Sequence, residues 1–276
     1  YVMSLKNEFV QMAERLNKIC NIAPIENVYL PPFYEGGQPK DEQFMAVSLA
    51  SGATGICYLL LPDEARPDYQ ALAPGDFAGK YPQEFAPAFG GGKPVEEMIA
   101  MACINAICQQ AMTELSIPLD HVTDPLGLLA PGPGDIIGMV GLFGGLTARI
   151  KKTGAQLIVI EKDEALIGQR RSFQVSADAA ELAKCNKVLC TGTTVLNNSL
   201  DDILANLSPD TFVSVVGPTV GYFPDPLFAR GVDVAGGRVV ADSREFLLRL
   251  AGKKRWTDST QKICFQKKTY QSLLDR

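Results

Sequence analysis

The second half of the chain alternates short apolar segments with amphipathic ones, and this alternation constrains the fold more than any other feature. Continuous apolar runs predict buried strands, and apolar residues at helical spacing predict helices between them. Strands of this kind indicate a parallel sheet covered on both faces, which right-handed crossovers wind into a Rossmann-like domain. The predicted strands are 136–140, 156–162, 187–192, 211–217 and 236–242, and the predicted helices are 146–152, 176–184, 199–207, 225–231 and 243–251.

The first half has a different pattern, which predicts an α+β domain. Helical spacing of apolar residues covers 5–20, and 25–30 is expected as a strand. FMAVSLA (44–50) and ICYLLL (56–61) flank a glycine-containing turn and predict a β-hairpin. The segment 94–115 begins with proline and is apolar around much of its circumference, so it is expected to be a buried helix.

Residues 62–94 form a long stretch rich in Pro, Gly and aromatic residues. So long an irregular segment in a compact domain is usually functional or mobile. The aromatic side chains of this stretch, together with one aromatic residue that precedes it, have two possible roles. They either form a lid over an aromatic ligand or pack within the protein and against a neighbouring subunit, and the second interpretation is favoured. These residues are Tyr34, Tyr69, Phe77, Tyr81, Phe85 and Phe89.

A Pro- and Gly-rich connection at 116–134 predicts the boundary between the halves. We expect an N-terminal domain over 1–120, a Rossmann-like domain over 121–252 and a basic tail over 253–276. The tail holds seven Lys and Arg residues against two Asp, and it is expected to be a solvated arm that packs across a domain or a neighbouring subunit. A role in binding an anionic ligand or a nucleic acid is the second interpretation.

Composition excludes several classes of function. The net charge of −5 disfavours nucleic-acid binding, and the uncharged stretch 136–148 is too short to span a bilayer. The chain has one histidine, so a zinc site built from several histidines of one chain is impossible. Seven scattered cysteines and no visible secretory signal indicate reduced thiols in a cytoplasmic protein.

Residues 134–150, GDIIGMVGLFGGLTARI, carry glycines where a strand turns into a helix. The spacing of Gly138, Gly141, Gly144 and Gly145 departs from the dinucleotide pattern G-x-G-x-x-G. A helix that begins near Leu146 would nevertheless offer free N–H groups to an anion. The glycines either hold a ligand in this way or only permit close packing of helix on sheet.

The loops after the next strands are rich in hydroxyl and amide groups. CTGTTVLNN (190–198) and GPTVGYFPDP (217–226) leave the carboxyl ends of predicted parallel strands, as the glycine turn does. In open α/β sheets such loops converge on one ligand crevice. Their hydroxyls and amides suit phosphate or carboxylate groups, although helix capping explains any one loop equally well.

These segments resemble the DUF364 family, to which heavy-metal chelation has been ascribed. The resemblance rests on GMVGLFGGL, VIE, CNKVLCTGTTVLNNSLDDIL and VGPTVGYFPDPLFARGVDVAGGRVV. The first half is similar to the companion DUF4213 domain, through VYLPPF, FMAVSLASGATGICYLLL and MACINA. The resemblance implies an enolase-N-terminal-like domain, a Rossmann-like domain and a site in the cleft between them. It also implies a role in heavy-metal or cobalamin- and tetrapyrrole-type cofactor metabolism.

The pattern and the resemblance together give a set of expected ligand-binding residues. Glu161 ends a strand where an acid would meet a ribose, and Asn105 is an amide in an apolar helix that either binds ligand or fixes the helix to a loop. Asp41, Glu42 and Tyr58 are weaker candidates for the cleft. The full set is Asn105, Gly141, Phe143, Gly144, Glu161, Thr191, Gly192, Thr193, Thr194, Asn197, Gly217, Pro218 and Thr219.

His121 is the candidate proton carrier. With Asp120 and Asp124 it forms the pattern D-H-x-x-D, whose side chains either act as metal ligands or acid/base groups or form hydrogen bonds in the hinge between the halves. The cysteines are expected to be structural thiols. We expect a small-ligand-binding protein of metal or metal-cofactor metabolism. The alternatives are a nucleotide-dependent enzyme that uses Glu161, or a non-catalytic assembly protein, and homo-oligomerisation is left open.

Overall fold

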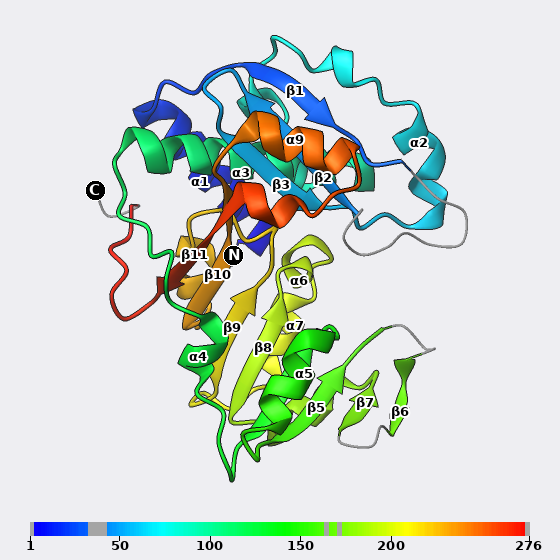
Figure 1. Cartoon of the computed structure of the whole chain (residues 1–276), viewed down its shortest axis with the longest axis vertical. Coiled ribbons are helices and arrows are strands. Elements are labelled where there is room, and N and C mark those ends of the chain that lie inside the picture. The colour runs from blue at the N-terminus through cyan, green and yellow to red at the C-terminus, as the bar shows by residue number, and fades with distance from the viewer. Residues whose placement is uncertain (1–2, 33–42, 163–165, 170–172, 274–276) are drawn as a thin grey trace.

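The computed structural model describes residues 3–32, 43–162, 166–169 and 173–273. Within these residues the first half of the chain forms a three-stranded antiparallel sheet and the second half an eight-stranded, mostly parallel sheet (Figure 1). This arrangement confirms the α/β class expected from the sequence. Two of the weaker candidates for the cleft, Asp41 and Glu42, lie outside the described residues, and so does the aromatic residue Tyr34.

The first sheet is backed by two long helices. Helix α1 starts after Ser4, whose hydroxyl oxygen accepts the N–H of Asn7 at 3.3 Å, and it buries its apolar face. Helix α3 packs directly on β3, because a Cβ added at Gly55 would lie 1.9 Å from the carbonyl oxygen of Ala102. The elements are α1 (Leu5–Ile19), β1 (Ile25–Tyr29), β2 (Phe44–Leu49), β3 (Thr54–Tyr58) and α3 (Pro94–Glu114), so the expected hairpin and buried helix are confirmed.

The stretch between β3 and α3 folds into short helical turns that cover this half. Tyr69, Phe77 and Phe89 are buried in the core, which confirms the packing interpretation for these three aromatic residues. The turns are η2 (Asp63–Ala65), α2 (Arg66–Gln70), η3 (Pro74–Asp76), η4 (Pro82–Glu84) and η5 (Ala86–Gly90).

The large sheet has the strand order β11-β10-β9-β8-β4-β5-β7-β6. Strands β10, β9, β8, β4, β5 and β7 are parallel, and the edge strands β11 and β6 are antiparallel to their neighbours. The strands are β4 (Ile136–Val140), β5 (Gln156–Ile160), β6 (Gly168–Gln169), β7 (Gln174–Ser176), β8 (Lys187–Thr191), β9 (Phe212–Val216), β10 (Val234–Val240) and β11 (Thr260–Gln266).

Helices cover both faces of the large sheet, as the alternation predicted. Side chains of α4 and α5 pack on one face with Met139 and Leu189, whereas η7, α6 and α7 pack on the other with Val188 and Cys190. The helices are α4 (Pro125–Leu129), α5 (Gly144–Lys151), η7 (Ala179–Lys184), α6 (Thr193–Leu196), α7 (Leu200–Ala205), α8 (Asp225–Ala229), α9 (Ser243–Ala251) and η8 (Trp256–Ser259).

Two segments differ from the sequence prediction. An α-helix was expected over 176–184. In the structure the first of these residues ends β7, and the helix that follows, η7, is shorter and is a 3₁₀ helix. The basic tail was expected to be a solvated arm, but residues 260–266 form strand β11, which pairs with β10. Ile263, Cys264 and Phe265 of this strand are buried. Ile263, Cys264 and Phe265 are consecutive, so their side chains point to both faces of β11, and both faces are covered at this point. The limits of the two domains stay a prediction.

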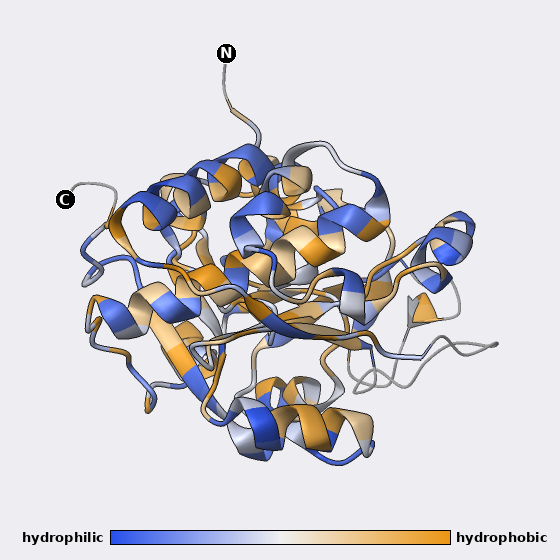
Figure 2. Cartoon of the chain, turned by 90° about the horizontal axis from the view of Figure 1, so that it is seen from above, coloured by the Kyte–Doolittle hydropathy of each residue, from blue (hydrophilic) through white to orange (hydrophobic). Residues whose placement is uncertain are grey.

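The two halves share one hydrophobic core. A continuous cluster of buried side chains extends from Phe9 and Met101 in the first half to Tyr222 and Phe223 in the second. Figure 2 shows hydrophilic residues along the outer faces of the peripheral helices and hydrophobic residues toward the sheets. None of the helices in the described ranges combines the length and apolarity that a membrane span requires.

Candidate functional site

The strand order defines a topological switch point between β4 and β8. From β4 the chain runs outward to β5 and β7, then crosses back to β8 and runs the other way to β9 and β10. At such a point the two connections leave in opposite directions, so open α/β sheets bind ligands outside the carboxyl ends of these two strands. The loop after β9, at the same edge of the sheet, contacts the first half of the chain, since the N–H of Tyr58 donates to Thr219 Oγ1 at 3.0 Å.

The glycine turn follows β4 at this point. Gly141 has a φ of +85°, and a Cβ there would lie 3.0 Å from Thr191 Cγ2, so both conformation and space require glycine. Glu161, at the end of β5, accepts the N–H of Leu142 at 3.1 Å and that of Lys162 at 2.8 Å. The carboxylate therefore fastens the glycine turn to the neighbouring strand.

Helix α5 starts at the end of this turn with two exposed glycines, Gly144 and Gly145. Neither has a positive φ, and apart from the adjoining residues and the helix's own backbone, no atom of the described residues lies within 4 Å of a Cβ built on either glycine. Packing against the described part of the chain therefore does not require glycine at these two positions. Phe143, half-buried, precedes them and packs against the apolar cluster under α5.

The loop after β8 lies beside the glycine turn. Thr191 and Thr193 are half-buried, and the hydroxyl groups of the two lie 3.2 Å apart. Thr194 is 1 % exposed and donates its hydroxyl to the carbonyl oxygen of Thr191 at 2.7 Å, so it is a structural residue. Gly192 is buried against Val220, where a Cβ would lie 2.6 Å from Cγ2 of that valine.

Asn197 lies further along this loop and is exposed. Its side-chain oxygen accepts the N–H of Ser199 at 3.1 Å and the hydroxyl of Ser199 at 2.6 Å. The carboxamide is therefore held in a local cap next to α7, and its amide nitrogen has no hydrogen bond within the described part of the chain.

The loop after β9 is closed by the first half of the chain. Gly217 adopts a φ of +147° and donates its N–H to Gly236, and Pro218 is half-buried. Thr219 is 2 % exposed and contacts both Tyr58 and Asn105. Asn105 is equally buried, so its side chain fixes α3 to this loop, which is one of the two roles that the sequence left open.

Tyr58, at the end of β3, contacts the loop after β9 and lies near Glu161. Its hydroxyl donates to the side-chain oxygen of Gln43, and its ring packs edge-on against Phe44 with centroids 5.3 Å apart. Burial raises the pKa of the Tyr58 hydroxyl, and the nearby Glu161 carboxylate raises it further. The tyrosine is therefore a neutral hydrogen-bonding group near neutral pH.

His121 lies away from the switch point. Its Nδ1 is 2.7 Å from the carbonyl oxygen of Lys262 in β11, the strand at the far edge of the sheet. Asp120 accepts two main-chain N–H groups, and Asp124 caps α4 and pairs with Arg149. The D-H-x-x-D segment thus ties the connection between the halves to β11, and the structure does not bring it to the other candidate residues.

Family comparison agrees with this architecture. The DUF364 model, described as "Putative heavy-metal chelation", matches residues 124–265, which is just over half of the chain. The chain belongs to the DUF364 family. The DUF4213 model, with the same description, matches residues 42–108 in the first half. No curated protein matches the chain.

Two solved DUF364 structures share the whole fold. A protein of unknown function from Pyrococcus horikoshii superposes with a TM-score of 0.68 at 16 % identity, over 95 % of this chain and 99 % of the other. One from Desulfitobacterium hafniense superposes with a TM-score of 0.67 at 14 % identity, over 94 % and 99 % of the two chains. At these identities the similarity shows the fold that DUF364 proteins share.

The description of DUF364 as a chelation domain can be tested on the side chains. Within the described ranges, no group of three or more His, Cys, Asp and Glu residues is arranged to hold a metal ion. All seven cysteines are buried and free, and burial raises the pKa of Cys190 to about 12 and that of Cys264 to about 11. Metals bind thiolates, so these protonated thiols do not fit a direct metal site.

Two hollows lie elsewhere on this DUF364 protein. One of about 130 Å³ is lined by α1, and the other, of about 310 Å³, lies between the start of α1 and the start of α7. Neither includes a residue of the glycine turn. One polar residue at the carboxyl edge of the sheet was missed by sequence reasoning: Arg238 in β10, which follows two glycines in an ordinary strand pattern and carries no motif.

Proposed function

We propose that the protein binds a small organic anion at the β4/β8 switch point. The backbone N–H groups at the start of α5 and the hydroxyls of Thr191 and Thr193 hold its phosphate or carboxylate group. Helix N-termini favour anions because their first N–H groups are unpaired and carry the positive end of the helix dipole.

The observation that carries this proposal is the open space at Gly144 and Gly145. A glycine in a helix costs up to about 1 kcal/mol relative to alanine. Gly141 is explained by its positive φ, whereas neither the backbone conformation of these two glycines nor their packing against the described residues requires glycine. Their missing side chains leave the backbone of the first turn of α5 open to close approach by a ligand.

In this proposal, the metal that the family description mentions is bound by the organic ligand and not directly by the protein. The groups that donate hydrogen bonds at the switch point are threonine hydroxyls, main-chain amides and a phenol, which suit anionic oxygen atoms better than a bare soft metal ion. A metal is then carried inside an organic chelate, such as a tetrapyrrole or a metallophore, whose carboxylates the protein recognises.

The alternative of a nucleotide-dependent enzyme receives less support. In a dinucleotide site, the acid at the end of the second strand accepts hydrogen bonds from the ribose. Both carboxylate oxygens of Glu161 already accept main-chain N–H groups. That role is structural, and it accounts for the residue without a nucleotide.

The test is isothermal titration calorimetry with a simple alkyl monophosphate as the probe. Thr193→Val keeps the shape of the side chain and removes the hydroxyl, so we expect it to weaken binding roughly tenfold. Thr113→Val, at an exposed position near the end of α3, is the matched control and should bind as the unmodified protein does. Equal affinity of the two variants would place the anion elsewhere, and absence of binding to the unmodified protein would refute the proposal.

A further inference from the structure

Arg238 lies at the same edge of the sheet as the switch point. Strand β10 pairs with β9 only as far as Gly236, opposite Val216, and then continues beyond the end of β9. Arg238 therefore stands just past the carboxyl ends of the parallel strands. The loop after β9 packs against the same stretch of β10, since the N–H of Gly217 donates to the carbonyl oxygen of Gly236 at 3.0 Å.

Arg238 also lies on the same face of the sheet as α5. A Cβ on Gly236 would point at Pro125, which begins α4, and side chains two residues apart on a strand share a face. Helices α4 and α5 contribute to one apolar cluster over that face. Leu189 belongs to this cluster, so Thr191, two residues later, lies on that face between α5 and Arg238.

The guanidinium of Arg238 is half-buried, and among the described residues no carboxylate pairs with it. Its Nη1 donates to Thr260 Oγ1 at 2.7 Å and to the carbonyl oxygen of Thr257 at 3.4 Å, and within the described residues no ion pair includes it. Burial lowers its pKa, and the charge of Arg255 lowers it further, although Asp258 opposes this. Its cross-strand neighbour in β11 is Lys262, another cation.

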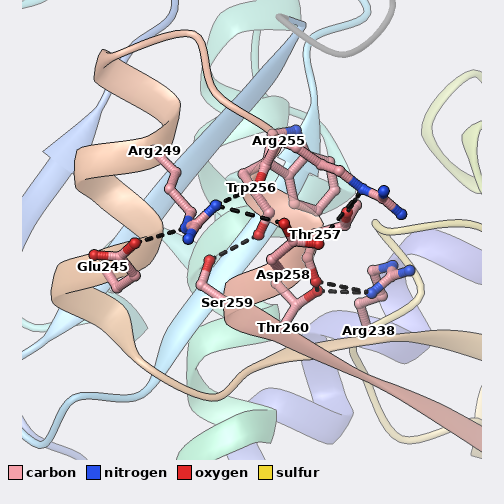
Figure 3. Close-up of polar contacts among 9 residues, drawn as sticks. All are labelled: Arg238, Glu245, Arg249, Arg255, Trp256, Thr257, Asp258, Ser259 and Thr260. Atoms are coloured by element: carbon pink, nitrogen blue, oxygen red, sulfur yellow. Dashed lines mark hydrogen bonds and ion pairs between the residues drawn. The ribbon is translucent and has the colours of Figure 1, made fainter.

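The acids of this region are already engaged by other arginines. Arg249 binds Glu245 at 2.7 Å and lies 3.5 Å from Asp258, and Nε of Arg255 lies 3.4 Å from the same aspartate. Figure 3 shows the guanidinium groups of Arg238 and Arg255 on one side of Asp258, away from Arg249. Two adjacent cations with unused N–H donors repel each other, and an anion placed between them relieves that repulsion.

We propose that Arg238 and Arg255 form a second anion subsite, so that the ligand is an elongated organic molecule with an acidic group at each end. This rests on the proposed function, which places the first acidic group at α5. Strands β4 and β10 are three steps apart in the sheet, so the two subsites are about 14 Å apart. Gly217 and Pro218, the half-buried start of the loop after β9, lie between them, and the ligand's central part passes over these two residues.

The experiment compares two probes by calorimetry: an alkyl monophosphate, and a linear α,ω-alkyl diphosphate long enough to span about 14 Å. Each is titrated into the unmodified protein, Arg238→Gln, Arg255→Gln and the control Arg244→Gln. Arg244 is exposed on α9, and its replacement removes the same charge. Thermal unfolding of each variant verifies that it is folded.

We expect the diphosphate to bind the unmodified protein more tightly than the monophosphate does, by roughly tenfold to a hundredfold. Arg238→Gln removes this gain and leaves monophosphate binding unchanged, Arg255→Gln removes part of it, and Arg244→Gln removes none. Equal affinity for the two probes, or an equal loss in Arg244→Gln, would overturn the second subsite alone. Monophosphate binding that ignores Thr193→Val would overturn the proposed function, and failure of both probes to bind would overturn both proposals.

Discussion

The carboxamide of Asn105 holds the loop of Thr219, which is 114 residues away in the chain. Its Nδ2 donates to the carbonyl oxygen of Thr219 at 2.9 Å and to that of Ile56 at 2.7 Å. Asn105 and Thr219 are each 2 % exposed. One buried amide thus joins α3, β3 and the loop after β9, and it links the two halves of the chain inside their shared core.

Replacing this amide should destabilise the whole protein. Asn105→Ala leaves two buried carbonyl oxygens without a donor, and we expect the free energy of unfolding to fall by about 3 kcal/mol. Urea unfolding followed by circular dichroism measures this, and the continuous core predicts one transition. Asn197→Ala, which removes an exposed amide, should change stability by less than about 1 kcal/mol. An unchanged midpoint for Asn105→Ala would show that the residue does not hold the halves together.

Gly141, in the turn after β4, and Gly145, in the first turn of α5, should respond in opposite ways to replacement by alanine. Gly141→Ala forces a side chain into a positive φ close to Thr191, so we expect a loss of about 1–2 kcal/mol of stability. Gly145→Ala meets no atom and should leave stability equal or slightly higher, by at most about 1 kcal/mol. It should nevertheless weaken binding of the monophosphate probe, because its methyl group occupies the open space. If Gly145→Ala binds the probe normally, the anion does not approach this turn.

The seven thiols should be unreactive in the folded protein. All are buried, and burial raises the pKa of Cys108 and of Cys190 to about 12, so the reactive thiolate is scarce at pH 8. A disulfide-exchange reagent should label them slowly in buffer and rapidly in urea. Titration with Cd²⁺ should give no thiolate absorption band while the protein is folded. Rapid labelling of a single cysteine in buffer would contradict the structure and revive direct metal binding.

Stability should fall in acid partly because of Asp135. Hydrogen bonds from Lys187, which lies at 2.8 Å, and from Asn186 lower the pKa of this carboxyl to about 2. A folded-state pKa below the unfolded value means that the stabilisation is complete above about pH 4 and is lost as pH falls toward 2. Asp135→Asn should remove this part of the pH dependence and lower stability near neutral pH by about 2 kcal/mol. Urea midpoints at pH 7 and pH 3 for the two proteins check it; a parallel fall in both would exclude Asp135.

The sequence was informative wherever a local pattern decides the structure. Continuous apolar runs in 136–140 and 187–192 predicted strands β4 and β8, and the apolar circumference of 94–115 predicted the burial of α3. The glycine pattern also located the turn at the end of β4. These features depend on the spacing of side chains along one element, so neighbours in the chain are sufficient to predict them.

Strand pairing between distant segments could not be predicted in this way. KICF in the basic tail is too short a pattern to identify an edge strand until β10 is known to lie beside it. His121 seemed a candidate for chemistry because it is the one histidine, yet it lies against β11, far along the sheet from β4. Its position depends on how the connection between the halves crosses the sheet, which local spacing does not specify.

Residue types in local order were sufficient to predict the family, the α/β class and the three loops at one edge of the sheet. Which polar residues remain available at that edge depends on contacts between segments distant in sequence. Thr194, Thr219 and Asn105 are used to bind the chain to itself, whereas Thr193 and the start of α5 stay accessible. The same structure brought Arg238 to that edge. Burial and the partners of a polar group are set by segments distant in sequence, so no reading of one loop could assign them.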